Sequence, residues 1–570
     1  MLHDLCTTQG EALTGTPWQV YPRPQMRRES YVNLNGDWEF ACSQSPALPE
    51  DYPLTIRLPF CPESLLSGRN MQVPPGSYLY YRKKVRVPAD FFRGRVLLHI
   101  GAADQIAQVL VNGASAGTHA GGYNSFTLDI TEFWSDENEI VIVCFDDLQD
   151  KTMPYGKQSL KRGGMWYTPV SGIWQSVWLE SVPQEYIRSL RIENRGSAVT
   201  IATDPALDGT VTVDGLGSFE LRGGKLVIEP EEPRLWSPED PYLYTFTLET
   251  ATDRVESYFA IRTLETKRID GILRLCLNGK PYFFHGLLDH GYWPDGIYTP
   301  AAPECYAEDI LAMKRLGFNT LRKHIKVEPE EFYYQCDKLG MIVFQDMVNN
   351  GDYSFLRDTA LPTVGLTRIS DRRLHGNEKT RREFLRCMEA TVHQLKNHPC
   401  ILYWTIFNEG WGQFDSDSVY DRLKELDDTR IIDSTSGWFR QKKSDVDSRH
   451  IYFTPWSQLK PGEKPLVLSE FGGYACPVEG HLFNSGNAYG YKTCKTLDQF
   501  RRAMDTLYRQ KVLPAIGRGL CGAICTQVSD VEDEINGFLT YDRRVCKGDE
   551  AAMQALAEDL QRAILGKTRL

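Results

Sequence analysis

Two glutamates stand at the ends of apolar runs, where a buried strand would finish. Glu409 follows the run ILYWTIFN, and Glu470 follows PLVLS. A carboxylate at the end of a buried strand calls for a structural or functional explanation, because a buried charge is costly unless it is paired or hydrogen-bonded. Two carboxylates that face one cavity suggest cleavage of a glycosidic bond. In that reaction one protonates the leaving oxygen, and the other, ionised, attacks or stabilises the oxocarbenium-like centre.

Other polar residues stand at the ends of similar runs and would converge on the same place. They are Asp289, Arg322, His324, Asp346, Asn408, His450, Gln527 and Asp530. For any single member of this set, capping a helix or pairing with a neighbour is the ordinary alternative.

The sequence pattern after about residue 266 predicts the strands and helices that must position these residues. Eight strand-like runs alternate with helical stretches: YFFHGLLD, NTLRKHI, MIVFQDM, ILYWTIFNE, RIIDSTS, RHIYFT, PLVLSEF and GAICTQVSD. Between Thr380 and Leu395, apolar residues at helical spacing form one stripe. Eight such units predict a closed parallel barrel, whose active site lies at the carboxyl ends of the strands. Glu409 and Glu470 would then end the fourth and seventh strands.

The region before the barrel has a different pattern. From about residue 30 to 180, short alternating runs such as YLYYRKKVRVP, RVLLHIG and EIVIVCF are separated by turn residues, which is typical of antiparallel β-structure. The next 85 or so residues repeat this texture, with breakers between Pro233 and Pro241, and predict a second small sandwich.

Length, charge and cysteine usage exclude several classes. A chain of 570 residues is too long for one core, so we expect two to four domains. The net charge is −11 and the basic residues are scattered, which argues against a nucleic-acid partner. No apolar stretch is long enough to cross a bilayer, so no membrane partner is expected. The amino-terminal segment lacks a secretory pattern, and fourteen irregularly spaced cysteines, several within apolar runs, indicate reduced thiols and a cytoplasmic protein.

Several segments together resemble glycoside hydrolase family 2. KNHPCILYWTIFNEGWGQFD looks like the acid/base signature of that family, GFNTLRKHIKVEPEEFYYQCDKLGMIVFQD resembles its other signature, and KPLVLSEFGG resembles its nucleophile strand. LNGDWEF, LVNGASAGTHAGGYNSFTLDIT and TPVSGIWQSVWLE resemble its sugar-binding jelly-roll domain. LWSPEDPYLY and LNGKPYFFHG resemble the end of its immunoglobulin-like domain and the entry to its barrel.

The resemblance implies a multidomain β plus α/β fold in three parts. These are a jelly-roll β-sandwich at residues 1–182, an immunoglobulin-like β-sandwich at 183–265 and a catalytic (β/α)8 TIM barrel at 266–570. It also implies a double displacement that retains the anomeric configuration. Glu470 attacks, and Arg322 keeps its pKa low, while Glu409 begins protonated because of its apolar setting and the nearby charge of Glu470. For such a pair we predict carboxyl groups about 5 to 5.5 Å apart.

Further site residues follow from the same resemblance. Asn408 would bind the sugar 2-hydroxyl. His324 either lines the pocket or is a satisfied structural histidine, and Asp289, Tyr452 and Gln527 are additional candidates for substrate binding. Trp411 and Trp438 are the preferred stacking platforms for a sugar ring, because both are expected in loops that follow strands.

The identity of the sugar stays open among the activities of the family. β-Glucuronidases resemble one another in an Asn-x-Lys element that meets the sugar carboxylate, and in VEDEINGFLTYDRR those positions hold Glu534 and Asn536. An acid there would repel a uronate. β-Galactosidases usually show His-Tyr-Pro where this chain has His324, Ile325 and Lys326. We rank a β-galactosidase first, with a β-glucuronidase or β-mannosidase as alternatives.

Two other classes compete with this interpretation. One is a non-catalytic carbohydrate-binding protein on the same fold, and the other is a metal-dependent hydrolase, for which we find no ligand pattern. We expect no required cofactor and predict no metal ligands, with a structural or activating Mg²⁺ or Na⁺ ion left open. The expected partner is a small-molecule or oligosaccharide β-glycoside. The sequence leaves the oligomeric state open, and only analogy with the family points to a homo-oligomer.

Overall fold

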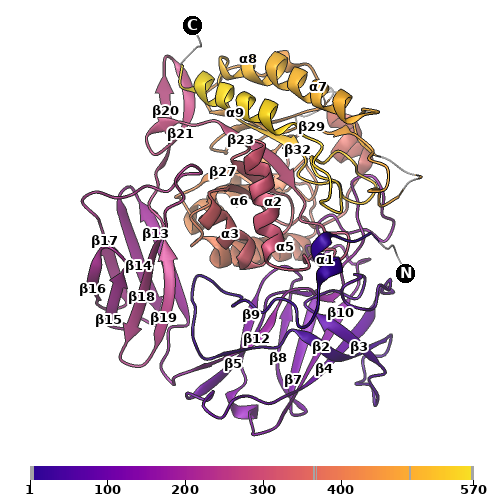
Figure 1. Cartoon of the computed structure of the whole chain (residues 1–570), viewed down its shortest axis with the longest axis vertical. Coiled ribbons are helices and arrows are strands. Elements are labelled where there is room, and N and C mark those ends of the chain that lie inside the picture. The colour runs from indigo at the N-terminus through magenta and orange to yellow at the C-terminus, as the bar shows by residue number, and fades with distance from the viewer. Residues whose placement is uncertain are drawn as a thin grey trace.

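The computed structural model describes residues 5–566, apart from 364, 365, 367, 368, 453, 485, 487 and 488. Three regions follow one another along the chain (Figure 1). Two regions of antiparallel strands, coloured indigo to magenta, lie below and to the left of a barrel whose helices are magenta, orange and yellow. The multidomain β plus TIM-barrel architecture predicted from the sequence is confirmed.

The first region is a sandwich of two main sheets. Six strands pair in the order β3-β2-β4-β10-β7-β8 and four in the order β1-β12-β5-β9. Their alternating residues, among them Trp38, Phe40 and Ile56, form one buried cluster. The strands are β1 (Tyr31–Asn33), β2 (Gly36–Ser43), β3 (Leu54–Leu58), β4 (Ser77–Val85), β5 (Arg95–Ile100), β7 (Ile106–Val111), β8 (Ala114–Ala120), β9 (Phe126–Asp129), β10 (Asn138–Asp146) and β12 (Val177–Val182), with the short pair β6 (Ala103–Asp104) and β11 (Gly172–Ile173) beside them.

The second region is a smaller sandwich with its own core. Three strands pair in the order β13-β14-β17 and four in the order β16-β15-β18-β19. They are β13 (Ser189–Arg195), β14 (Ala198–Asp204), β15 (Gly209–Val213), β16 (Gly217–Leu221), β17 (Lys225–Ile228), β18 (Tyr244–Thr250) and β19 (Arg254–Phe259). Strands β20 (Leu264–Ile269), β21 (Ile272–Leu277) and β22 (Lys280–Pro281) then lead into the barrel.

Eight parallel strands form the barrel, and each corresponds to one of the eight predicted runs. They are β23 (Phe284–Asp289), β24 (Thr320–Lys323), β25 (Ile342–Asp346), β26 (Ile401–Asn408), β27 (Ile431–Ser436), β28 (Asp447–Ile451), β29 (Leu466–Gly472) and β32 (Leu520–Thr526). Hydrogen bonds link them in the order β27-β26-β25-β24-β23-β32-β29-β28, and β27 also lies against β28. One residue of the predicted sixth run, at position 453, lies outside the described residues. Nearly every residue of these strands is buried, as expected where helices cover a parallel sheet.

Helices surround the barrel strands. They are α2 (Glu304–Arg315), α3 (Glu330–Leu339), α5 (Glu378–Leu395), α6 (Ser416–Leu426), α7 (Leu497–Leu507), α8 (Leu513–Ile516) and α9 (Glu550–Ile564), besides the short α1 (Thr8–Ala12) and α4 (Leu361–Thr363). In α5 the buried residues include Phe384, Cys387, Met388, Thr391, Val392 and Leu395, the stripe expected from the sequence. Asn377 caps this helix, because its side chain accepts hydrogen bonds from the amides of Lys379 and Thr380.

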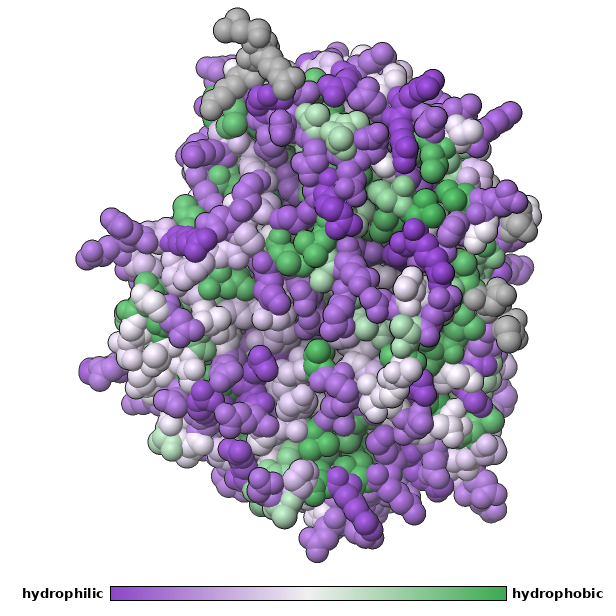
Figure 2. All heavy atoms as spheres, viewed as in Figure 1, coloured by the Kyte–Doolittle hydropathy of each residue, from purple (hydrophilic) through white to green (hydrophobic). Residues whose placement is uncertain are grey.

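The surface and the cysteines agree with a folded, reduced chain. Hydrophilic residues dominate the face shown in Figure 2, with hydrophobic ones in patches between them. All fourteen cysteines are unpaired, and Cys144, Cys276, Cys521 and Cys525 are buried as predicted. Among the described helices, none combines the length and the apolar character that crossing a bilayer requires.

A buried ion-pair network joins the segment before β1 to both sandwiches. The Arg28 guanidinium donates to Glu180 of β12 over 3.1 Å and to Asp253, between β18 and β19, over 2.7 Å. The same group donates to the main-chain oxygen of Ile187. All three charged side chains are at most 4% exposed. Glu180 would keep its ion pair with Arg23, but Asp253 has no other ion pair among the described residues, and a buried charge without a partner is strongly destabilising.

We therefore expect Arg28→Met to lower the free energy of unfolding by about 3 kcal/mol or more. Thermal unfolding should show a lower Tm, with the loss concentrated in the transition of the β region. The matched control is Arg222→Met, because Arg222 forms an exposed ion pair with Glu220. A pair of that kind contributes about 1 kcal/mol or less. Equal Tm values for the two variants would contradict the inference that the buried ion pairs of Arg28 stabilise the fold.

Candidate active site

Glu409 and Glu470 face one another at the carboxyl ends of the barrel strands. Glu409 directly follows β26, and Glu470 lies in β29. A carboxylate oxygen of each and a ring nitrogen of His450, in β28, all lie within 4.8 Å of one another. This separation is close to the short carboxyl spacing of about 5 to 5.5 Å that retaining glycosidases use, and well below the spacing in inverting enzymes.

The backbone at Glu409 is held in an unusual conformation. Its φ is +53°, in the left-handed region that non-glycine residues seldom adopt. The Glu409 amide nevertheless donates to the Ser436 carbonyl over 2.9 Å, so the residue stays tied to β27. At Gly410, where φ is +77°, a Cβ would lie 2.4 Å from the Phe439 ring. Strain of this kind persists where the surrounding structure imposes it, and it is typical of functional sites.

The guanidinium of Arg322, at the end of β24, is the centre of the site. It is 1% exposed and donates to Glu470 over 2.9 Å, to Asn408 over 2.8 Å and to Asp346 over 2.9 Å. Burial alone lowers the pKa of Arg322, but the charges of Asp346 and Glu470 outweigh it and raise that pKa above its ordinary value. The cation is therefore permanent. On its other oxygen Glu470 accepts a hydrogen bond of 2.8 Å from the Tyr452 hydroxyl.

His450 is the direct partner of Glu409. Its Nδ1 lies 2.7 Å from a Glu409 oxygen, and its Nε2 lies 2.9 Å from the Ser436 hydroxyl. Burial raises the pKa of the Glu409 carboxyl, but the hydrogen bond to His450 and the charges of His450, Lys157 and Arg322 outweigh it, so the pKa lies below its ordinary value. The direction of this shift is opposite to the one expected from the sequence, where burial and the charge of Glu470 were expected to raise this pKa. The sequence did not indicate how many positive groups surround this carboxyl.

The other predicted side chains divide into those at the site and those beside it. His324 lies 2.7 Å from Asp346, and burial together with the charge of Lys157 holds its pKa well below the ordinary histidine value. Gln527 accepts a hydrogen bond from His290 and donates to Asn536 over 2.7 Å. His324 contacts the Arg322 network through Asp346. The His290 ring lies beside it, with the centroids of the two histidine rings 4.9 Å apart.

Asp289 belongs to a different network. Its carboxylate accepts hydrogen bonds from Lys323 over 2.7 Å and from the Gly291 amide, and Lys323 also pairs with Glu328. Burial raises the pKa of Asp289, but Lys323 outweighs this effect and lowers it. The structure thus places Asp289 in an ion-pair cluster next to the site, where its oxygens are already engaged.

The two predicted tryptophan platforms differ in their positions. Trp438 lines a pocket of about 700 Å³ that also contains Glu409 and His450. Trp411 is 3% exposed, donates to the Gly351 carbonyl and packs behind Trp166 with their rings 5.1 Å apart. Trp411 therefore supports the wall of the pocket and does not line it.

A lysine of the first sandwich reaches this site, and nothing in the sequence singled it out. Lys157 lies between β10 and β11 in a segment that docks on the barrel, where the amides of Tyr155 and Gly156 both donate to the Asn349 carbonyl. The residue is 9% exposed, and its ammonium has no hydrogen-bond or ion-pair partner among the described residues. Its charge lowers the pKa of His290, His324 and Glu409. A lone lysine in a loop has no periodicity or spacing that could reveal this docking.

Glu409, His450 and Glu470 also have the spacing of a cation site. In this arrangement Arg322 contacts the Glu470 carboxylate and His450 contacts the Glu409 carboxylate.

Comparison with known protein families supports the relation to glycosidases. The sequence model for "Glycosyl hydrolases family 2, TIM barrel domain" matches residues 270–555, and that for "Glycosyl hydrolases family 2" matches residues 187–262. The first match alone spans half of the chain.

Individual relatives carry different activities. A β-galactosidase of Thermoanaerobacter pseudethanolicus is 23% identical over 440 residues, which are 70% of this chain and 55% of that protein. A β-glucuronidase of Chlorocebus aethiops is 25% identical over 567 residues, covering 81% of each. The chain spans about half the length of three of the curated relatives that it matches.

Solved structures show the same fold. A β-glucuronidase from an uncultured Clostridium species superposes with a TM-score of 0.71 at 18% identity, covering 96% of this chain and 100% of the other. A family 2 β-galacturonidase from Eisenbergiella tayi superposes with a TM-score of 0.68 at 19% identity, covering 95% and 99%.

Proposed function

Because this chain belongs to glycoside hydrolase family 2 and is a glycosidase, we propose that it removes a terminal β-linked sugar by double displacement with retention. Glu470 is the nucleophile and Glu409 is the acid/base. The observation that carries the proposal is the approach of the two carboxylates to within 4.8 Å across one hollow, one bonded to Arg322 and the other to His450. The cleavage then proceeds in two steps.

In the first step a Glu470 oxygen attacks the anomeric carbon while Glu409 transfers its proton to the departing glycosidic oxygen. A glycosyl ester on Glu470 results, and the leaving group departs as an alcohol. In the second step the Glu409 carboxylate takes a proton from water, the water oxygen attacks the anomeric carbon, and Glu470 leaves. Arg322 and Tyr452 hold Glu470 in place for attack and stabilise it as a leaving carboxylate.

Asn408 is positioned to recognise the sugar. Its amide oxygen accepts from Arg322, so the orientation of the amide is fixed and its nitrogen is directed elsewhere. A hydrogen bond from this nitrogen to the 2-hydroxyl would strengthen as charge develops at the anomeric carbon.

Replacing the nucleophile and the acid should have different effects. We expect Glu470→Gln to reduce kcat by roughly 10⁴-fold or more on every substrate, the scale of loss when a nucleophile is removed. Glu409→Ala should reduce kcat by roughly 10²- to 10⁴-fold for poor leaving groups. It should spare activated aryl glycosides or be rescued by azide, because a good leaving group needs no proton. Equal loss on both substrate types for Glu409→Ala would count against its acid role.

The lowered pKa of Glu409 predicts an acid-shifted pH profile. The carboxyl must carry a proton to act, and a depressed pKa means that this proton is lost at a lower pH, so the basic limb of kcat/KM moves toward acid. His450→Gln removes the largest group that lowers this pKa, and we expect the basic limb to move upward by roughly one pH unit. His481→Gln is the control, because His481 pairs with Asp542 away from the carboxylates. A basic limb that does not move in His450→Gln would rule out this coupling.

The sugar is proposed to be a neutral hexose, with β-galactoside first. Glu534 is 4% exposed, bonds to Tyr167 and Asn536, and is close enough to Glu470 for their charges to interact. A sugar carboxylate would meet this acid. The specific observation that favours the alternative, a β-uronide, is the unpaired ammonium of Lys157, which also acts on Glu534. With a neutral sugar, Lys157 would donate to one hydroxyl and Glu534 would accept from another.

A panel of 4-nitrophenyl β-glycosides (galactoside, glucuronide, mannoside, glucoside and fucoside) separates these alternatives. We expect release from the galactoside, and Lys157→Met should raise its KM by about tenfold, the value of one hydrogen bond to a charged group. If the glucuronide is the substrate, the same variant should raise KM by about 100-fold, because an ion pair is lost. Lys161→Met, an exposed lysine nearby in the chain, serves as the control. Release from no member of the panel would favour a carbohydrate-binding protein without catalysis.

A further inference from the structure

One face of the Glu409 carboxyl opens onto a large pocket that the proposed mechanism leaves unassigned. Its volume is about 700 Å³, which is within the range of small-molecule sites. The lining residues come from the first sandwich and from several barrel loops: Gly163, Gly164, Met165, Trp166, Tyr353, Phe355, Thr359, Ala360, Glu409, Trp438, His450, Tyr452, Thr454, Tyr489, Gly490 and Tyr491. Glu470, Asn408 and Arg322 do not line it, whereas Tyr452, which bonds to Glu470, does, so the pocket starts beside the carboxylate pair and extends from it on the Glu409 side.

Aromatic rings form most of the wall. The Trp166 ring meets that of Tyr353 edge-on at 5.1 Å, and the Tyr452 ring stacks on that of Tyr491 at 3.9 Å. Trp438 lies near His450, with ring centroids 5.6 Å apart. At the rim, Phe355 is 68% exposed and so presents an apolar ring to solvent.

Charged groups are scarce in this pocket. Among the described lining residues, Glu409 and His450 are the only members of the Asp, Glu, His, Lys and Arg set, and they are bonded to each other. The Thr359 hydroxyl is engaged with that of Tyr353. The Tyr452 hydroxyl is engaged with Glu470, and the Trp438 indole N–H is a donor without a partner in the described part of the chain. A second sugar would therefore find few groups for its many hydroxyls, and each unmade hydrogen bond opposes binding. A planar apolar group would instead bury its faces against the rings.

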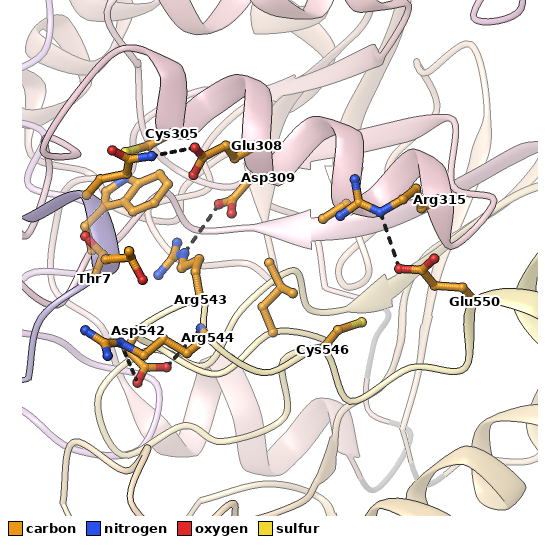
Figure 3. A pocket seen from close by; sticks show the side chains of 15 residues that line it. Thr7, Cys305, Glu308, Asp309, Arg315, Asp542, Arg543, Arg544, Cys546 and Glu550 are labelled. Atoms are coloured by element: carbon orange, nitrogen blue, oxygen red, sulfur yellow. Dashed lines mark hydrogen bonds and ion pairs between the residues drawn. The ribbon is translucent and has the colours of Figure 1, made fainter. Parts of the chain in front are cut away.

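The pocket shown in Figure 3 differs in each of these respects. It has a volume of about 330 Å³, lies between α1, α2 and the segment before α9, and contains neither candidate catalytic glutamate. Its charged side chains already pair, as Arg543 does with Asp309 and Arg315 with Glu550. It therefore supports no proposal.

We infer that the 700 Å³ pocket binds an aromatic, apolar leaving group, so that the substrate is an aryl glycoside and not an oligosaccharide. The inference rests on the proposed function, because Glu409 must touch the oxygen that links sugar and leaving group. That oxygen at Glu409 places the leaving group against Trp166, Tyr353 and Trp438.

The test uses one sugar, the one that the panel identifies, with phenyl, 2-naphthyl and 4-phenylphenyl leaving groups. These phenols have similar acidity, so differences in KM report binding and not bond cleavage. We expect KM to fall about tenfold from phenyl to 4-phenylphenyl, since a second ring buries some tens of Å² of apolar surface. A disaccharide of the same sugar with glucose as leaving group should have a KM at least tenfold above that of the phenyl glycoside.

Two variants test which pocket residues cause the dependence of KM on the size of the leaving group. Trp166→Ala should abolish the preference for the larger ring, and Phe355→Ser should reduce it about threefold. Phe355 is exposed, so its replacement does not threaten folding. Phe92→Ser is the matched control, because Phe92 is 56% exposed and lies outside the pocket. It should leave the KM ratio unchanged.

Equal KM values for the phenyl and 4-phenylphenyl glycosides, or a preference for the disaccharide, would overturn the inference while leaving the glycosidase intact. If no glycoside is cleaved, the proposed function fails, and the pocket is tested separately by calorimetry with 4-phenylphenol. Binding that Trp166→Ala weakens at least tenfold and Phe92→Ser leaves unchanged supports the aromatic site. Absence of binding, or equal binding by both variants, overturns it.

Discussion

One guanidinium holds the site together. Arg322, fully buried at the end of β24, donates to side chains from three other strands: Asp346 in β25, Asn408 in β26 and Glu470 in β29. Its planar fork fixes directions as well as distances, which a lysine could not do. Because Asp346 balances part of its charge, the cation can remain in a dry interior and still hold Glu470 by a hydrogen bond of 2.9 Å. Asn408 and Glu470, the two residues proposed to touch the sugar ring, both depend on this cation for their positions.

The second carboxyl has an opposite requirement. In the proposed mechanism Glu409 must carry a proton at the start of the reaction, yet His450, Lys157 and Arg322 all favour its charged form. This arrangement suits the second step, in which Glu409 accepts a proton from water, better than the first. A bound leaving group that displaces water from the aromatic pocket would raise the pKa of Glu409 by desolvation. Substrate binding and proton supply are then coupled through the same space.

The sequence was sufficient for the parts that depend on periodicity. Eight apolar runs corresponded to eight barrel strands, and the placement of Glu409 and Glu470 at strand ends brought them together. Contacts that arise where the first sandwich docks on the barrel, or where one side chain pairs with another, could not be predicted from the sequence. Lys157 and Trp166 belong to a sandwich loop whose contacts with the barrel leave no repeat in the sequence, and Asp289 resembled a site residue until Lys323 was seen beside it.

The resting state of Glu409 was beyond prediction for a related reason. Its pKa reflects the sum of burial and several charges that arrive from β24, β28 and the first sandwich. The apolar run before Glu409 in the sequence indicates only that this residue is buried, and not which charges surround it. Trp411 shows the same limit for packing, since a tryptophan beside the catalytic motif turned out to stand behind the wall that Trp166 forms.

The loop between β10 and β11 has a consequence for how a protein of this architecture could diversify. It supplies one ammonium near Glu409 and one indole in the wall of the 700 Å³ pocket, while the proposed catalytic residues stay on the barrel. Exchange of a short stretch in a different domain could therefore redirect selectivity without touching the catalytic framework. By the same reasoning, an isolated barrel would lack part of its recognition surface even if it folded.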